Sequence, residues 1–524
     1  MAFITELLLF TSFILIGIYV WAKYHFSYWR RKNVPNVEPN FFFGNFKEML
    51  MMSKNCADIL INLYNHKNAK DQPILGIYIF NKPALLIRDP ELVKSICVKN
   101  FDKFSNRYAQ SDIKGDTLGS ATLFMINNPE WKELRTKLSP VFTSGKMKQM
   151  FPLVEEIGND LDAYINSFPM DKNSNSFVRE VKEMCSLFAT DVIATVAFGI
   201  KTSSLKNPKD AFRIVGRSML DFTLWRGLEF VVAFFIPHLA SLFRCRLFTK
   251  DAEIFFRTTI NSVMDDRIQN GTTRNDLIDV LAEFKKERLS DNHKNDNLSM
   301  TNDTLVAQAA TFFIAGLETS ASTMSFCLYE LSKNPEIQER LREEIRLALL
   351  RNITLTGKDT LTYEDVYGME YLDMVIMETL RLYPSLPILD RICTLPKDEK
   401  EFSLKPFSDF AIPNNMPLYV PKIAIQRDSK YFPNPDKFDP ERFSAKNKSN
   451  IQTGTYLAFG LGPRSCIGYR MGLLKTKIGL ISFLRNHILR TCNKTTKQIY
   501  FEPKALFIQT KGGIFCEFVR DPLI

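Results

Sequence analysis

The order of apolar and polar residues predicts one membrane-spanning helix at the N-terminus. Residues 2–22 form a nearly continuous apolar run, broken only by Glu6 and a few Ser and Thr residues. Such a run is long enough to cross a bilayer as a helix. Lys23 and the basic residues 30–32 follow the run, whereas no Lys or Arg precedes it. By the positive-inside rule, we expect a lumenal N-terminus and a body on the cytoplasmic face.

A cleaved signal peptide is the alternative for this run. It would need a basic segment before the run and a cleavage site of small residues, whereas Trp21, Tyr24, Tyr28 and Trp29 suit a membrane-interface belt. A mitochondrial transit peptide should be amphipathic and rich in Arg, which this segment is not. The run is therefore interpreted as an uncleaved anchor.

The chain divides into three predicted parts: a transmembrane anchor at 1–22, a basic linker at 23–45 and a single folded domain at 46–524. Pro35 and Pro39 should hold the linker extended as a stiff hinge. No Ser/Gly-rich linker or internal repeat marks a further boundary after residue 50.

The folded domain is predicted to begin with a β-hairpin and then to be largely helical. Residues 74–80 and 84–87 alternate in polarity across Asn81-Lys82-Pro83, and Asp89-Pro90 predicts the start of a helix. Most of the remaining chain has the 3.6-residue period of helices, with few strand-like runs before its C-terminal part. The pattern predicts a mainly α fold with small β-sheets.

Two further segments, residues 301–333 and 230–236, are predicted to be a long helix and a short apolar run. A helix without proline is predicted from Thr301 to Lys333, with Thr301 as its N-cap, and Asn334-Pro335 should start the next helix. Residues 230–236 form a shorter apolar run before Pro237, too short to span a bilayer. A buried core segment is the simplest interpretation of that run.

Composition is that of a folded protein, with 45% hydrophobic and 24% charged residues in 524. Lys and Arg number 68 against 58 Asp and Glu, a net charge of +10. This excess could serve an anionic membrane surface or an acidic partner, and no nucleic-acid motif accompanies it. The nine Cys are odd in number and form no CxxC pair, which favours a reducing compartment over a disulfide framework.

Candidate chemistry centres on residues 459–468, which read Phe-Gly-Leu-Gly-Pro-Arg-Ser-Cys-Ile-Gly. Cys466 stands directly before a predicted helix at 469–485, whose dipole and backbone N–H groups should lower the thiol pKa. One thiolate cannot close a zinc or iron–sulfur site, and no second Cys or His lies nearby. A haem iron needs only this one protein ligand.

This loop resembles the haem loop of the cytochrome P450 haem-thiolate monooxygenases, F-G-x-G-x-R-x-C-x-G, and all six fixed positions match. A buried structural Cys would leave the five other matches unexplained. The resemblance implies the P450 fold, an anchor in the endoplasmic reticulum and haem b, with Cys466 as the axial ligand of the iron.

Residues 315–320 (Ala-Gly-Leu-Glu-Thr-Ser) resemble the oxygen-binding motif of the same family. A glycine in mid-helix costs about 1 kcal/mol against Ala, so Gly316 needs a reason. The Thr319 hydroxyl can bond back to the Ala315 carbonyl and open the helix into a groove for dioxygen and water. Glu318 would supply the acid of a proton relay, so the resemblance implies Glu318 and Thr319 as catalytic residues.

Further motifs occur along the chain in the same order as in the cytochrome P450 family. Glu378 and Arg381, with Arg442 of the segment Phe-Asp-Pro-Glu-Arg-Phe at 438–443, resemble its E-x-x-R and P-E-R-F elements, whose role is structural. Trp131 and Arg135 stand four apart on one helical face and can point at one anion. The segment after them, residues 138–146, resembles the microsomal branch that includes insect family-six and vertebrate family-three drug-metabolising members. By resemblance, residues 511–514 form a late hairpin.

The resemblance assigns two sets of residues. The haem-binding residues, several of them partners of the haem carboxylates, are Trp131, Arg135, Arg391, Phe459, Arg464, Cys466 and Gly468. The substrate-pocket residues are Phe124, Thr311, Phe312, Ala315, Leu386, Ile388 and Leu389. It also implies a second, peripheral membrane contact near the apolar run at 230–236.

The implied reaction is monooxygenation of a lipophilic small molecule. Insecticides and plant toxins are the expected substrates, and an endogenous hormone, steroid or fatty acid is the alternative. No dinucleotide or flavin site is evident, so electrons should come from NADPH–cytochrome P450 reductase, with cytochrome b5 as a second donor. A haem-thiolate isomerase would not need Glu318 and Thr319; a non-enzymatic haem-binding membrane protein would show no turnover.

Overall fold

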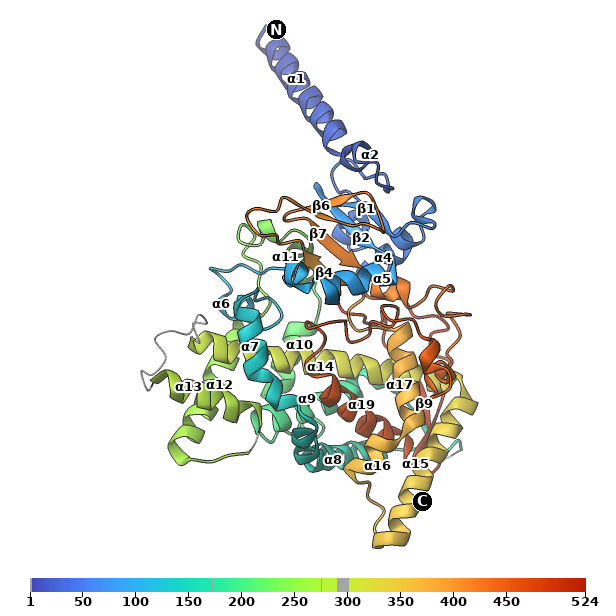
Figure 1. Ribbon diagram of the computed structural model, residues 1–524. Helices are drawn as coiled ribbons and strands as arrows, with labels where there is room; N and C mark the ends of the chain where they lie inside the picture. Colours follow the sequence, from blue (N-terminus) through green and yellow to red (C-terminus); the bar gives the residue numbers. More distant parts are fainter. Residues whose placement is uncertain (1, 172, 275, 290–300) are drawn as a thin grey trace.

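The computed structural model describes residues 2–171, 173–274, 276–289 and 301–524, and within them helices predominate over three small sheets (Figure 1). The prediction of a mainly α fold with small β-sheets is confirmed. The helices are α1 (Ala2–His25), α2 (Tyr28–Arg31), α3 (Lys47–Leu50), α4 (Cys56–Tyr64), α5 (Pro90–Lys94), α6 (Thr117–Ser120), α7 (Glu130–Leu138), α8 (Ser144–Asn166), α9 (Val181–Phe198), α10 (Ala211–Leu220), α11 (Leu224–Phe235), α12 (Lys250–Asn270), α13 (Leu277–Leu289), α14 (Asn302–Lys333), α15 (Pro335–Thr356), α16 (Tyr363–Gly368), α17 (Glu370–Leu382), α18 (Lys422–Ile425) and α19 (Tyr469–Leu484). The strands are β1 (Ile74–Ile79), β2 (Lys82–Ile87), β3 (Ser176–Glu180), β4 (Leu389–Ile392), β5 (Glu401–Ser403), β6 (Ala411–Pro413), β7 (Pro417–Val420), β8 (His487–Arg490) and β9 (Phe515–Arg520).

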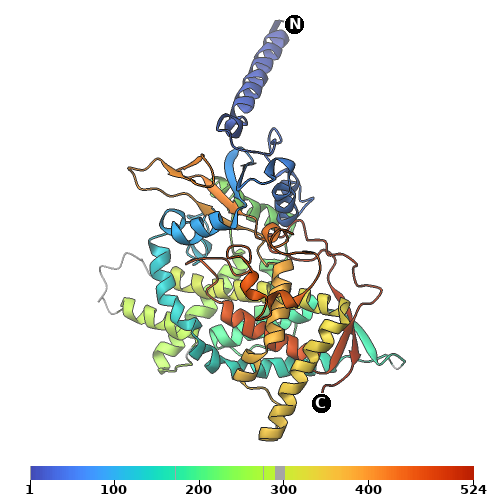
Figure 2. The same ribbon diagram turned by 45° about the vertical axis from the view of Figure 1, so that its right-hand side comes forward.

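Helix α1 projects from the body as a separate rod in both views (Figures 1 and 2). Nearly all of its side chains are exposed, and its segment Phe3–His25 is long and apolar enough to cross a membrane. It runs to His25, three residues past the predicted boundary of the anchor. An exposed apolar helix of this length is consistent with membrane anchoring.

The segment expected as a linker packs onto the first sheet. Trp29 is fully buried, and its Nε1 donates a hydrogen bond of 2.9 Å to the Ile77 carbonyl. A Cβ on Gly76 would lie 2.5 Å from the Trp29 ring, so glycine is required there. Val37 also pairs with the Gly76 carbonyl. The expectations of a stiff hinge separate from the body and of Trp29 at the membrane interface are therefore wrong, because both segments pack against β1.

The predicted hairpin is confirmed as β1 and β2, which pair antiparallel in a sheet of order β1-β2-β7-β4. Its turn is shorter than expected, because Lys82 and Pro83 pair with Ile79 and Tyr78 inside the ladder. Asp89 caps α5 by accepting a hydrogen bond of 2.9 Å from the Leu92 N–H. The predicted start of a helix at Asp89-Pro90 is confirmed.

The predicted late hairpin is wrong. Strand β9 pairs with β3 and β8, whereas the segment before Lys511 contributes only the single bridge Phe501–Thr510. Both Gly512 and Gly513 have positive φ, which turns the chain toward β3. There the Ile514 N–H donates to the Glu180 carboxylate at 2.9 Å.

Helix α14 crosses the middle of the body, with α9 and α19 beside it (Figure 1). It ends at Lys333 as predicted, and Thr301 caps it by accepting from the Thr304 N–H at 3.1 Å. Gly479 of α19 permits the close packing, since a Cβ there would lie 2.4 Å from the Met324 sulfur. The helix that carries Ala315 to Ser320 is thus held on several sides.

The apolar run at 230–236 belongs to α11 and its C-cap, and all of its side chains are buried. The core interpretation of this run is confirmed, and the expectation that these residues touch a membrane is wrong. Their burial in a cluster with Tyr419, Phe46 and Ile388 removes the apolar surface that a bilayer would need.

Glu378, Arg381 and Arg442 come together as the motifs predicted. Two nitrogens of Arg381 donate to the Glu378 carboxylate at 2.7 and 2.8 Å, and the Arg442 Nε lies 3.4 Å from it. The Arg381 and Glu378 side chains are fully buried, and Arg381 also donates to the carbonyls of Gln426 and Pro435. This cluster ties α17 to the chain that leads to the Cys466 loop.

We predict a pH-dependent loss of stability from His487. Its ring is buried between Phe177 and Phe518, neither ring nitrogen has a hydrogen-bond partner among the described residues, and burial lowers its pKa from 6.5 to about 4. Between these values the unfolded chain binds a proton that the folded chain does not, so stability falls as pH falls. The loss should be about 2 kcal/mol between pH 7 and pH 5.

His487→Phe should remove this component, so its chemical-denaturation midpoint should fall less between pH 7 and pH 5 than that of the parent. Equal falls in the two proteins, followed by circular dichroism, would show that His487 is not the titrating group.

Candidate active site around Cys466

The loop that carries Cys466 is closed by its own backbone. The Cys466 N–H donates to the Phe459 carbonyl at 2.8 Å, and Gly460 and Gly462 both have positive φ. A Cβ on Gly462 would lie 1.9 Å from the Cys97 carbonyl oxygen, so only glycine fits. The loop ends at Gly468, the N-cap of α19, which confirms the predicted helix after the cysteine.

Cys466 retains accessible surface although protein surrounds it closely enough for burial to raise its thiol pKa. The accessible surface therefore faces a space inside the protein. A hydrogen bond from the Gly468 N–H and the charges of Arg135 and Lys422 act in the opposite direction. The expected lowering of the pKa is wrong for the protein alone, because burial outweighs these groups.

A second internal surface lies on α14. Within residues 304–332, Ala315 is the one exposed residue, although it stands in the middle of the helix. The Thr319 hydroxyl donates to the Ala315 carbonyl at 2.6 Å, as predicted, and that of Thr311 donates to Ala307 at 2.6 Å. The helix remains continuous through this turn.

Phe142 connects the two sides of this space. Its ring packs 5.0 Å from that of Phe312 on α14 and lies 3.6 Å from the position of a Cβ on Gly468. Leu389 approaches the other end of the loop, 3.8 Å from a Cβ on Gly460. Of the remaining pocket candidates, Phe124, Leu386 and Ile388 share one apolar cluster.

Glu318 lies elsewhere than expected. Its carboxylate is paired with the Lys182 ammonium and accepts from the Ser322 hydroxyl at 2.7 Å. All three line a hollow of about 430 Å³ between α9 and α14. Successive helix residues diverge by about 100°, so the acid and the Thr319 hydroxyl face different sides. The structure does not bring them together.

The loop is surrounded by buried cations with little negative charge to balance them. Arg107, Arg135, Arg391, Arg464 and Lys422 influence one another or Cys466, and the one carboxylate among them is Asp390. Asp390 pairs with Arg107 at 2.6 Å. Five positive groups against one carboxylate leave an excess that a buried site cannot hold without an anion.

Individual nitrogen atoms of these arginines also lack hydrogen-bond acceptors. The buried Nε atoms of Arg107, Arg391 and Arg464 have no hydrogen-bond partner among the described residues. The Arg464 guanidinium lies 4.3 Å from the Trp131 ring and donates to the Ile126 carbonyl at 2.8 Å, and burial lowers its pKa to about 8. Trp131, Arg135 and Arg391 of the predicted set thus all interact with Arg464, and Arg135 also acts on Cys466.

Lys422 and the Arg107–Asp390 pair were not found from the sequence. Lys422 is 3% exposed, has no partner for its ammonium in the part of the chain that the structure describes, and burial lowers its pKa to about 7. The available signal was a single lysine inside the apolar segment at 417–425. Such a lysine is as often a strand-end residue at the surface, so only the packing identifies it.

Sequence comparison agrees with the geometry. The model of the cytochrome P450 family matches residues 34–517. "Probable cytochrome P450 6g2" of Drosophila melanogaster is 46% identical over 514 residues, covering 97% of this chain and 98% of the relative. "Probable cytochrome P450 6v1" of the same species and "Cytochrome P450 6k1" of Blattella germanica are each 40% identical, over 98% of this chain and 99% and 97% of the relatives.

The residues present fit haem, the cofactor of that family. Haem carries two carboxylates, which would meet the unpaired buried cations, and it needs one axial ligand, for which the Cys466 sulfur has open surface. The internal exposure of Ala315 leaves space on the opposite side. Within the described residues, Asp390 is the one carboxylate that acts on this group of cations.

We predict that Lys422→Met weakens haem binding without weakening the haem-free fold. The substitution removes a charge-assisted contact to a haem carboxylate, so haem transfer to apomyoglobin should accelerate about tenfold. The haem-free protein should be at least as stable as the parent, because an unpaired buried cation is lost.

Lys477→Met is the matched control. Lys477 is equally buried, but its ammonium is satisfied by Asp373 and the Val366 carbonyl, both at 2.9 Å. Its loss should destabilise both forms. Unchanged haem transfer in Lys422→Met would remove Lys422 from the haem site.

Proposed function

The chain belongs to the cytochrome P450 family, and from this premise we propose that it oxidises lipophilic foreign compounds, such as plant toxins and insecticides, at the endoplasmic-reticulum membrane. The observation that supports this proposal most strongly is at Cys466. Its sulfur has accessible surface inside the protein, and the buried cations beside it outnumber the carboxylates that could balance them. The family's activity is haem-thiolate monooxygenation, in which one oxygen atom of O₂ enters the substrate and the other becomes water.

Each group of residues has a separate part in this proposal. Haem held through the Cys466 sulfur would supply oxygen activation. The Gly468 N–H and the loop closed through Phe459 hold that sulfur in place. Trp131, Arg135, Arg391 and Arg464 orient the haem through its carboxylates.

In this proposal, residues of α14 supply the protons of the reaction. The reaction consumes two protons and two electrons for each O₂, and the Thr319 hydroxyl lies beside the internal surface at Ala315, to whose carbonyl it donates. Glu318, held by Lys182 and Ser322 beside a hollow of about 430 Å³, is placed to exchange protons with solvent. Transfer from Glu318 to Thr319 then requires a water or a side-chain rotation, because the two face apart.

The substrate space is apolar. Phe312, Ala315 and Leu389 border it, with Phe124, Leu386 and Ile388 in the adjoining cluster, and Thr311 is the single polar candidate, its hydroxyl satisfied within the helix. Such walls select for lipophilic molecules and give few directional contacts. Broad acceptance of foreign compounds fits this lining better than recognition of one hydroxylated hormone.

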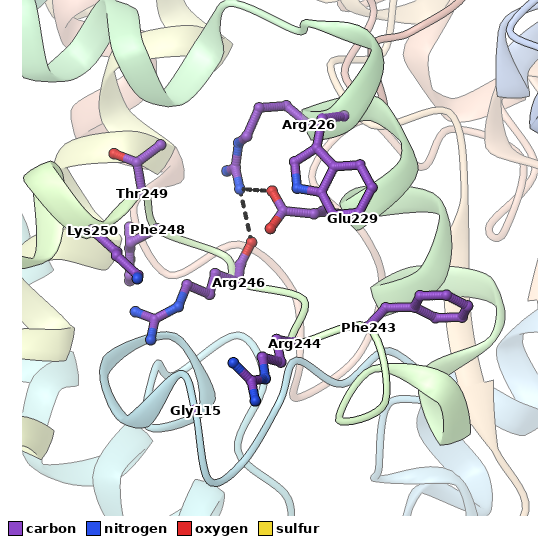
Figure 3. Close-up of a pocket in the computed structure, with 10 residues that line it drawn as sticks. Gly115, Arg226, Glu229, Phe243, Arg244, Arg246, Phe248, Thr249 and Lys250 are labelled. Carbon is purple, nitrogen blue, oxygen red and sulfur yellow. Dashed lines mark hydrogen bonds and ion pairs between the residues drawn. The ribbon is translucent and has the colours of Figure 1, made fainter.

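Membrane contact near α11 is proposed at its flanks rather than in its buried run. Leu224, Trp225, Leu242 and Phe243 are all exposed large apolar residues. A hollow of about 450 Å³ beside them is lined by Arg244, Arg246 and Lys250, and the Arg226–Glu229 pair lies next to it (Figure 3). Exposed apolar side chains next to basic ones suit an anionic bilayer surface. Together with α1, this patch supports a body held on the cytoplasmic face.

We predict that substrate oxidation depends on NADPH and a flavoprotein reductase and incorporates one labelled atom from ¹⁸O₂. The purified full chain would be screened against insecticides and plant toxins, and separately against steroids and fatty acids. Turnover confined to the second set would overturn the xenobiotic proposal. Product formation without NADPH would favour a haem-thiolate isomerase.

Electron delivery is proposed at the basic surface next to the thiolate. Lys132 and Arg470 are exposed, Lys132 lies one turn before Arg135, and Arg470 donates to the Phe142 carbonyl at 3.4 Å. An acidic reductase, or cytochrome b5, would be attracted to this face.

Lys132→Glu/Arg470→Glu should slow reduction by the reductase about tenfold at low salt, because charge reversal repels the acidic partner. Reduction by dithionite should be unaffected. Lys405→Glu, an exposed lysine near the β5–β6 hairpin, serves as the control. Equal reductase rates in all three proteins would place docking elsewhere.

A further inference from the structure

Lys475 lies in α19, the helix that follows Cys466, and its side chain reaches across to α14. Its ammonium donates a hydrogen bond to the carbonyl of Gly316, and the residue is only 1% exposed. No charged group contributes to its pKa, which burial alone lowers to about 7. Its amine therefore has no acidic partner in the part of the chain that the structure describes.

Two glycines make this contact possible. A Cβ on Gly316 would lie 2.8 Å from the Ile193 side chain of α9, and one on Gly479 would lie 2.4 Å from Met324 of α14. Gly479 stands one turn after Lys475 in α19. The close approach of α9, α14 and α19 therefore depends on these glycines, and it brings the ammonium to the carbonyl.

The carbonyl that Lys475 binds is next to the one that Thr319 binds. Thr319 donates to Ala315 at 2.6 Å, and Lys475 donates to Gly316, so two consecutive carbonyls of α14 each accept a side-chain hydrogen bond. A side chain that bonds to a helix carbonyl shares that acceptor with the backbone ladder, so the geometry of this turn depends on both side chains. Lys475 acts on this turn from a different helix.

A simple packing role would not need the charge. Burying an ammonium without an anion is unfavourable by several kcal/mol, whereas a methionine would fill similar space. Lys477, two residues on, shows the ordinary solution, since Asp373 and the Val366 carbonyl satisfy it. Lys475 has neither acid nor surface exposure, and its one protein acceptor among the described residues is at the turn that presents Thr319.

We propose that Lys475 is a positioning residue for oxygen activation, which holds the Gly316 carbonyl and so keeps the turn from Ala315 to Thr319 in the geometry that serves proton delivery. The contact also couples the helix that follows the thiolate to the helix on the opposite side of the haem. The inference rests on the proposed function only in the part that it gives to Thr319.

Lys475→Met in the full-length, haem-loaded protein tests the contact. Hydrogen–deuterium exchange of the amides at 316–320 should accelerate about tenfold, the effect of losing one charge-assisted hydrogen bond. The fraction of NADPH electrons that end in hydrogen peroxide should rise, because poorly placed protons release reduced oxygen before it reaches substrate. The ferrous–CO spectrum should match that of the parent. Unchanged exchange at 316–320 overturns the inference, whatever happens to turnover.

Two further variants separate the possible failures. Lys477→Met should destabilise the protein without a selective increase in exchange at 316–320. If Thr319→Ala leaves the peroxide fraction unchanged, the proposed role of Thr319 fails, while the exchange result still decides the Lys475 contact. Should Lys475→Met lose haem, Lys475→Leu, which is shorter and also lacks an N–H donor, is judged by the same exchange and peroxide measurements; parental values of both would overturn the proposal.

Discussion

The excess of buried positive charge beside Cys466 is the constraint on which the rest of the site depends. Arg391, Arg464 and Lys422 are buried on a strand, a loop and a short helix, and the half-buried Arg107 pairs with Asp390, the one carboxylate among them. A protein core does not tolerate such an excess without an anion of its own. We propose that the two carboxylates of haem supply this anion and that the Cys466 sulfur binds its iron.

The body is built to hold the two sides of that space in register. The Glu378–Arg381–Arg442 cluster joins α17 to the chain that leads into the Cys466 loop, and Gly462 lets the loop lie against Cys97. On the other side, α14 packs closely against α9 and α19, where an added Cβ on Gly316 would lie 2.8 Å from Ile193 and one on Gly479 would lie 2.4 Å from Met324. Close packing of this kind places reacting groups more accurately than loops alone could.

Many features of the fold and the site could be predicted from short segments of the sequence. Short motifs such as the Cys466 loop and the Thr319 back-bond are determined by residues near one another in the chain, and the N-cap at Thr301 is equally local. Groups that meet across long separations were missed: Lys422 near the loop, Lys182 on Glu318, Lys475 on Gly316. The same limit explains the errors at Trp29, at residues 230–236 and at β9. In each case the apolar residues pack against residues far away in the chain. Neither hydrophobic periodicity nor composition specifies which distant residues those are.

The central claim is that the Cys466 sulfur binds the iron of a haem held by the buried cations. The ferrous–CO difference spectrum of the full chain, compared with that of Cys466→Ser, tests it most directly. The account predicts the red-shifted Soret band of a thiolate-ligated haem in the parent and its absence in the variant. The same thiolate-type band in both proteins would contradict it.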